Sequence, residues 1–203
     1  MPTGFEKIKN KIKRAPKGTL FILADFSHLD ISYNTLKELI RRLVKSGDLV
    51  LVYRGIYQKP KFNTTLNRNV PASPSEIAST YARKNNWHIV ASGDTALNQL
   101  GLTTQVPNTY QYKSSGPNRE ITLKNGQKIQ FKSVLQREIG MNSLSALVIE
   151  ALKAIGENQV NEADLKIIKS KLSTDQLKQL RKDSALSRSW IRDFIVKMEE
   201  LAE

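Results

Sequence analysis

The sequence predicts an α+β fold, and three observations support that prediction. Apolar residues recur at helical spacing along residues 34–45. A β-rich run at residues 49–53 follows Gly47 and is joined through residues 54–55 to a second short strand. Within residues 109–133 the apolar period changes to two, as expected for strands with one buried face. The chain therefore combines helices with short β-ribbons.

The N-terminal elements follow an ordered pattern over residues 1–62. A helix is expected over residues 4–14, then a short strand within Thr19–Leu23, then a short helix through Leu29. Ser32 opens the next helix, and Gly47 ends it because glycine takes a left-handed conformation at no steric cost. A helix, a turn, a second helix and a basic two-stranded ribbon are typical of a winged helix-turn-helix. This segment is therefore expected to be a DNA-binding domain.

The rest of the chain is expected to form a second domain and a helical tail. Residues 63–72 are polar without a sustained period, which predicts a linker. Residues 73–140 predict a small antiparallel sheet packed on two helices, with the pair Asn125-Gly126 as a hairpin turn. Residues 141–203 carry apolar residues at helical spacing and are expected to be a helical C-terminal region.

Net charge is unevenly distributed. The 203 residues carry a formal charge of +13, of which residues 1–70 supply +9 and residues 71–203 supply +4. This asymmetry points to a polyanionic partner for the N-terminal part, the alternative being a basic surface that serves only solubility. The absence of cysteine, of a secretory h-region and of a bilayer-length apolar stretch predicts a cytoplasmic protein without membrane contact.

Base contacts are expected from the N-terminal end and outward face of the helix over residues 34–45, since a recognition helix enters the major groove end-first. Asparagine can pair with adenine and lysine can reach guanine, whereas more distant cations neutralise phosphate. The alternative is a winged domain used for protein contact. The expected DNA-binding residues are Lys17, Ser32, Tyr33, Asn34, Lys37, Arg41, Lys45, Arg54 and Tyr57.

No motif in the sequence predicts catalysis. The chain lacks a P-loop, GxGxxG, GxSxG and paired histidines on a helix, and His28 and His88 are its only histidines. Residues 71–135 contain only Glu76, Asp94 and Glu120 as acidic residues, too few for a metal-dependent nuclease. We therefore expect no enzyme activity, no cofactor and no bound metal.

Two segments carry a resemblance to a known family. LKELIRRLVKSGDLVLVYRGIY and ASGDTALNQLGLTTQVPNTYQYKSSGPNREITL resemble the DUF6088-type branch of AbiEi-like antitoxins from bacterial abortive-infection systems, over roughly residues 20–135. The resemblance implies a phage-defence antitoxin that also represses its own operon at an operator with inverted repeats. It implies a nucleotidyltransferase toxin as the counterpart, with direct contact left open.

Within the resembling SSGPNRE segment, Arg119 is the candidate for antitoxin function. A guanidinium after a Gly-Pro turn can make a bidentate contact to carboxylate or phosphate. The alternative for Arg119 is a surface salt bridge with Glu120 or Glu138. The alternative for the whole chain is a stand-alone winged-helix transcriptional regulator without antitoxin activity.

Overall fold

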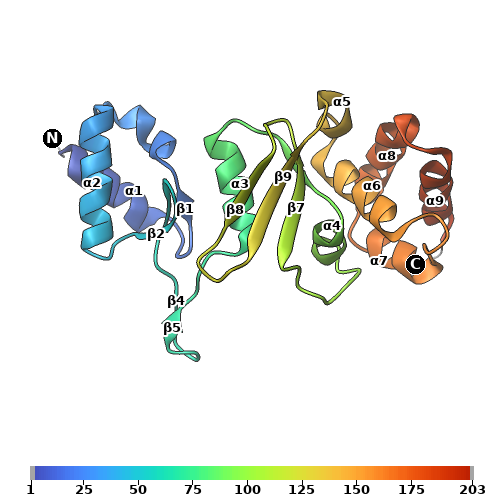
Figure 1. The fold of residues 1–203 in the computed structure, drawn as a ribbon, viewed down its shortest axis with the longest axis horizontal. Coiled ribbons are helices and arrows are strands. Elements are labelled where there is room, and N and C mark those ends of the chain that lie inside the picture. The colour runs from blue at the N-terminus through green and yellow to red at the C-terminus, as the bar shows by residue number, and fades with distance from the viewer. Residues whose placement is uncertain (1–2, 202–203) are drawn as a thin grey trace. The chain divides into compact units, whose positions relative to one another are not determined.

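Helices and short strands are interspersed along the chain, which confirms the α+β class (Figure 1). The computed structural model describes residues 3–201. Contacts divide the chain into two units, Met1–Asn86 and Trp87–Glu203. Each unit is described separately below.

Among the described residues, the first unit holds a three-stranded sheet and four helical segments. The sheet order is β1-β3-β2, and both strand pairs are antiparallel. A second, two-stranded ribbon pairs β4 with β5. Its elements are α1 (Gly4–Arg14), β1 (Leu20–Phe21), η1 (Leu23–Leu29), α2 (Tyr33–Lys45), β2 (Val50–Tyr53), β3 (Ile56–Gln58), β4 (Phe62–Asn63), β5 (Arg68–Asn69) and α3 (Pro74–Lys84).

Helix α2 has the bounds and the buried face that its sequence predicts. The Ser32 side chain accepts a hydrogen bond from the Thr35 backbone N–H at 3.3 Å, which caps the helix. Gly47 follows the helix at φ +82°, the left-handed conformation expected of a glycine there. The apolar residues of α2 join those of α1, η1 and β1 in one core: Ile8, Ile12, Phe21, Phe26, Leu36, Ile40, Leu43 and Leu49.

The segment expected to be a linker instead contains the β4–β5 hairpin. Asn63 accepts a hydrogen bond from the Leu66 backbone N–H at 2.9 Å through its side-chain oxygen. Asn67 adopts φ +47°, a left-handed conformation that asparagine tolerates better than most residues. The hydrogen bond to the Asn63 side chain closes the turn. Strands of two residues are too short to show an alternating apolar period, so the sequence did not predict them.

Helix α3 belongs to the first unit, whereas the sequence analysis grouped it with residues 73–140. Arg83 forms an ion pair with Asp25, and the Tyr81 and Tyr53 rings meet edge to face with their centroids 5.9 Å apart. These contacts join α3 to η1 and to β2 of the first unit. The division between units therefore follows Asn86 and not residues 63–72.

The second unit holds a four-stranded sheet in the order β6-β7-β9-β8. The β6–β7 and β8–β9 pairs are antiparallel, but β7 and β9 are parallel, so the expected purely antiparallel sheet is wrong. Its strands and helices are β6 (Ile89–Ala91), α4 (Asp94–Gln99), β7 (Thr109–Ser114), β8 (Arg119–Thr122), β9 (Lys128–Ser133), α5 (Gln136–Ile139), α6 (Ser143–Ile155), α7 (Glu162–Lys169), α8 (Thr174–Asp183), η2 (Ser184–Leu186) and α9 (Ser189–Glu200).

The parallel pair arises because β8 lies on the outer side of β9, so β7 bonds to β9 directly. The predicted Asn125-Gly126 turn does join β8 to β9, with Gly126 at φ +85°. Gly116, in the segment between β7 and β8, is buried below the Trp87 ring. The chain thus passes from β7 to the far edge of the sheet before returning.

The C-terminal helices are joined to this sheet through α6. Helix α6 contacts β6 and α4, and it buries Val148, Ala151 and Leu152 completely. Helices α8 and α9 in turn contact α6. Residues 141–203 therefore lie in the same unit as the sheet.

Candidate nucleic-acid interface

The outward face of α2 is polar, basic and exposed. Asn34, Lys37, Arg41 and Lys45 are all exposed, because Leu36, Ile40 and Leu43 turn the opposite face into the core. Positions three, four and four residues apart place these four side chains in one row along the helix. The structure therefore brings together four of the expected DNA-binding residues.

The first residues of α2 differ in their availability. The Ser32 hydroxyl lies 2.8 Å from the Thr35 hydroxyl and also caps the helix, so its polar atom is already engaged. Tyr33 is 65% exposed, so both its ring and its hydroxyl are accessible. Tyr57, on β3, packs against the core and is half-buried. Burial raises the pKa of the Tyr57 hydroxyl, and Tyr33 adds to that shift.

The turn between β2 and β3 is held in place by a lysine of α3. Arg54 is exposed, but its backbone carbonyl accepts a hydrogen bond from Lys84 Nζ at 2.8 Å. A Cβ added to Gly55 would lie 2.7 Å from the same nitrogen. The turn that carries Arg54 is therefore held by α3 of its own unit.

Lys17 lies away from the N-terminal end of α2. It lines a hollow of about 410 Å³ that also contains Leu43 and Gly47, which mark the C-terminal end of the helix. Lys9, Lys13 and Lys59 line the same hollow. Lys59 Nζ is bound by the Lys13 and Ala15 carbonyls at 2.8 and 2.7 Å. Lys17 therefore belongs to a second group of basic residues, with Lys9, Lys13 and Lys59, at the C-terminal end of α2.

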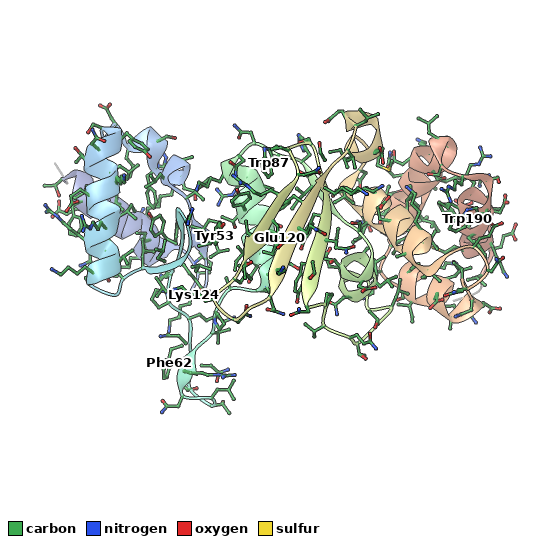
Figure 2. The ribbon with its side chains drawn as sticks, in the orientation of Figure 1. Tyr53, Phe62, Trp87, Glu120, Lys124 and Trp190 are labelled. Carbon is green, nitrogen blue, oxygen red and sulfur yellow. The ribbon has the colours of Figure 1, made fainter. Side chains whose placement is uncertain are left out.

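The sequence analysis missed the β4–β5 hairpin as a basic surface. Lys61 precedes it, Arg68 lies in β5, and no acidic residue occurs between Asp48 and Glu76. Phe62, labelled in Figure 2, is 50% exposed. The run without acidic residues could have indicated this basic surface. It was not recognised because the segment has no clear apolar period and therefore resembled a linker.

Arg119 begins β8 and is exposed. Glu120 pairs with Lys128 at 2.9 Å and Glu138 pairs with Lys113 at 3.2 Å, so neither takes the salt bridge considered for Arg119. Within residues 3–201 Arg119 itself has no ion pair, and it lines a hollow of about 520 Å³ with Phe131 and Lys132. Its guanidinium is available for an external anion.

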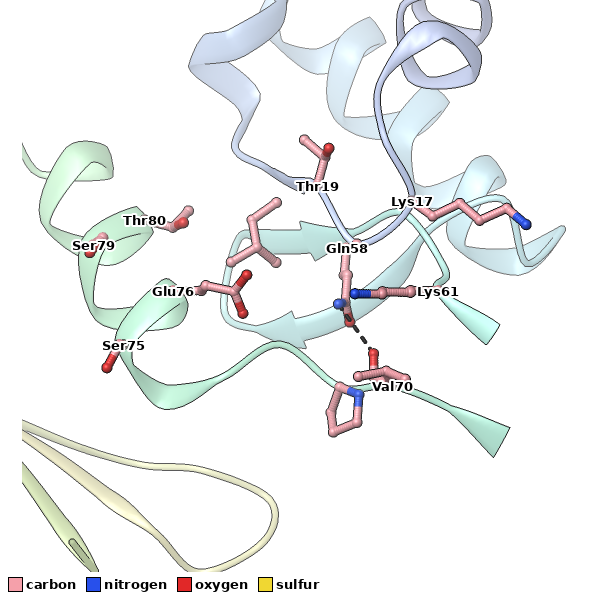
Figure 3. A pocket seen from close by; sticks show the side chains of 12 residues that line it. Lys17, Thr19, Gln58, Lys61, Val70, Ser75, Glu76, Ser79 and Thr80 are labelled. Atoms are coloured by element: carbon pink, nitrogen blue, oxygen red, sulfur yellow. Dashed lines mark hydrogen bonds between the residues drawn. The ribbon is translucent and has the colours of Figure 1, made fainter. Parts of the chain in front are cut away.

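A hollow of the first unit has a volume of about 600 Å³ and a mixed polar and apolar lining (Figure 3). Lys17, Ser79 and Thr80 are among its lining residues. Its one carboxylate, Glu76, accepts hydrogen bonds from the Ser73 N–H at 2.7 Å and the Ser73 hydroxyl at 2.8 Å. That carboxylate completes the cap of α3 and is not placed as a general base.

Two further observations concern the described part of the chain. Nowhere in residues 3–201 do three or more His, Asp or Glu side chains gather closely enough to hold a metal ion. Over the same residues, every helix is too short or too polar to cross a membrane.

Comparison with known proteins identifies the family. A family model described as "Family of unknown function (DUF6088)" matches residues 7–180. The chain belongs to this family. No curated protein matches the DUF6088 chain significantly. A solved structure, the crystal structure of RV2827C protein from Mycobacterium tuberculosis, aligns at 13% identity and a TM-score of 0.44. That alignment covers 98% of this chain and 77% of the other, and such a score does not establish a shared fold.

Proposed function

We propose that the first unit is a winged helix-turn-helix that binds double-stranded DNA. The order α1, β1, η1, α2, β2, β3 and the sheet order β1-β3-β2 support this assignment. In this proposal α2 is the recognition helix and the β2–β3 ribbon is the wing. A net charge of +9 on residues 1–70 fits a polyanion.

The observation that carries the proposal is the exposed row on α2. Asn34 and Lys37 lie in the first half of the helix, where a recognition helix meets base edges. Arg41 and Lys45 lie further along and suit phosphates. Glu38 is the one acidic residue of the helix, and Arg42 pairs with it at 3.8 Å. The row therefore presents amide and cationic groups without a free carboxylate beside them.

The first prediction is salt-dependent binding to the DNA upstream of the protein's own gene. Neutralising roughly 4–6 phosphates gives a slope of about −4 to −5 for log affinity against log salt. Asn34→Ala or Lys37→Ala is expected to cost about 1–3 kcal/mol and to relax sequence preference. Fluorescence anisotropy on a labelled duplex measures both effects. Lys178→Ala, an exposed lysine on α8, is the control. An affinity that does not change with salt would contradict the proposal.

We further propose that the chain is the antitoxin and autorepressor of a toxin–antitoxin operon. This rests on the resemblance of the LKELIRRLVKSGDLVLVYRGIY and SSGPNRE segments to AbiEi-like antitoxins. The counterpart is a neighbouring nucleotidyltransferase toxin. Arg119, exposed and without an ion pair in the described chain, supports a role for the second unit in this activity. A transcriptional regulator without antitoxin activity is the alternative.

The second prediction separates repression from protection. The toxin and the full-length chain are expressed from independent promoters, so that repression cannot account for rescue. Arg119→Ala is expected to lose protection and keep DNA binding, whereas Asn34→Ala/Lys37→Ala is expected to do the reverse. Growth after toxin induction and anisotropy are the two measurements. If the wild-type chain binds its operator but never protects, it is a regulator only.

A further inference from the structure

The β4–β5 hairpin combines cationic and exposed apolar side chains. Figure 1 shows it extending from the three-stranded sheet of its unit. Leu66, in its turn, is 56% exposed and Phe62 is 50% exposed. Lys61 and Arg68 flank them, and the acid-free run from Asp48 to Glu76 includes the whole hairpin. Large apolar side chains in such a setting indicate a contact surface.

The hairpin is held in a defined position. Gln58, a nearly buried residue of β3, donates from Nε2 to the Val70 carbonyl at 3.3 Å, as Figure 3 shows beside Lys61. The Val70 N–H donates to the Lys61 carbonyl at 2.7 Å and closes the base of the hairpin. The Asn63 side chain closes its tip. These hydrogen bonds fix the hairpin and place Leu66 in its turn.

The base of the hairpin adjoins the second group of basic residues. The side chain of Lys61 passes over Gly18, where an added Cβ would lie 3.3 Å from Lys61 Cδ. Lys17, next to Gly18, lines both the hollow shared with Lys61 and the hollow at the C-terminal end of α2. The cations at the base of the hairpin thus adjoin the C-terminal end of α2, whereas Asn34 lies at its N-terminal end.

We propose that the hairpin is a second DNA contact, which enters the minor groove flanking the site of α2. The inference rests on the proposed DNA-binding function and extends it. Lys17, Lys61 and Arg68 neutralise phosphates, and Leu66 packs against the sugars and base edges of the groove floor. An apolar wedge flanked by cations and asparagine amides is the residue set that minor-groove proteins use. A·T pairs suit this contact, because the guanine amino group obstructs the groove floor at G·C pairs.

The test uses the full chain and the upstream duplex of its gene. Lys61→Gln/Arg68→Gln is expected to weaken binding on the order of tenfold and to reduce the salt slope by about 1.8. Lys178→Gln/Lys182→Gln removes two exposed charges from α8 and is the matched control. Leu66→Asn is expected to weaken binding about fivefold while leaving the salt slope unchanged. All substituted side chains are exposed, and thermal melting checks that each variant folds.

The groove is identified by base substitution in the flank of the duplex. Inosine·cytosine pairs keep the minor-groove pattern of A·T and the major-groove pattern of G·C. Replacing flanking A·T by inosine·cytosine is expected to leave affinity unchanged, and replacing it by G·C is expected to reduce it about fivefold. Leu66→Asn is expected to abolish that difference. Equal affinity for A·T and G·C flanks would overturn the minor-groove assignment.

The outcomes separate this inference from the proposed function. Loss of binding in the Asn34 and Lys37 variants, with hairpin variants like wild type, overturns the hairpin contact and leaves α2 as the reader. Loss in the hairpin variants alone supports the hairpin and overturns the assignment of α2. No binding of the wild-type chain to any duplex overturns both.

Discussion

Gly116→Ala is expected to destabilise the second unit by about 3 kcal/mol, at the upper end of the usual cost of overpacking a core. A Cβ at this buried position would lie 2.2 Å from Cδ2 and Cε2 of the Trp87 ring. The ring cannot move freely, because it meets the Phe131 ring edge to face with their centroids 5.7 Å apart. The added methyl group must therefore displace either the indole ring or the chain between β7 and β8.

Urea unfolding followed by tryptophan fluorescence measures this effect. Both tryptophans, Trp87 and Trp190, belong to the second unit, so the signal reports on that unit. Gly126→Ala is the matched control, because nothing lies within 4 Å of its added Cβ and only its φ of +85° is strained. About 1 kcal/mol is expected there.

The same contact predicts a rescue. In a Trp87→Leu background Gly116→Ala is expected to cost clearly less than in the wild type, since a smaller side chain leaves room for the methyl group. Trp190 still reports unfolding in this background. If Gly116→Ala costs no more than Gly126→Ala, the steric argument fails.

Lys113→Met is expected to destabilise the second unit by about 3 kcal/mol, because it leaves a buried carboxylate short of one cation. Lys113 lies between two acidic residues, at 3.0 Å from Glu150 and 3.2 Å from Glu138. The Glu150 side chain is only 8% exposed, and Lys153, at 2.8 Å, remains as its second partner. Because the Lys153–Glu150 pair remains, the expected loss of stability is at the lower end of the range for a broken buried ion pair.

Lys128→Met is the matched control for this substitution. Lys128 also lies on the sheet and pairs with a glutamate, Glu120, at 2.9 Å. The side chains of Lys128 and Glu120 are both more than 40% exposed, so less than about 1 kcal/mol is expected. Equal losses for the two lysine variants in urea unfolding would show that burial of Glu150 contributes nothing.

The pH dependence of stability gives an independent measurement of the Lys113 cluster. The hydrogen bond from Lys113 lowers the pKa of Glu138, and burial, the next largest effect, raises it. The net pKa of Glu138 is below its usual 4.5. The stability that this shift contributes is present above pH 4.5 and is lost as pH falls through the lowered pKa of the folded chain. Burial lowers the pKa of Lys113, but Glu150 and Glu138 outweigh it, and the net pKa is raised. That contribution is present below pH 10.5 and is lost as pH rises through the raised pKa of the folded chain. Lys113→Met is expected to remove this alkaline dependence and to weaken the acidic one.

The local elements of this protein could be predicted because short-range chemistry determines them. Ser32 and Gly47 bound α2, and Asn125-Gly126 forms the turn of a hairpin, since a cap or a tight turn involves residues only a few positions apart. The exposed row of Asn34 and Lys37 followed from the same helical period that buries Leu36. The candidate residues on α2 were therefore accessible to sequence reasoning.

Other features depend on contacts between distant residues, and only the tertiary structure decided them. The β7–β9 pair is parallel because the whole of β8 passes to the outer edge of the sheet, which no local period encodes. Helix α3 joins the first unit through Arg83 and Asp25, which are 58 residues apart. The basic group around Lys17 and Lys61 likewise forms only where the chain returns beside Gly18. Local propensity determines which residues form helices and turns, whereas packing determines which of those elements meet.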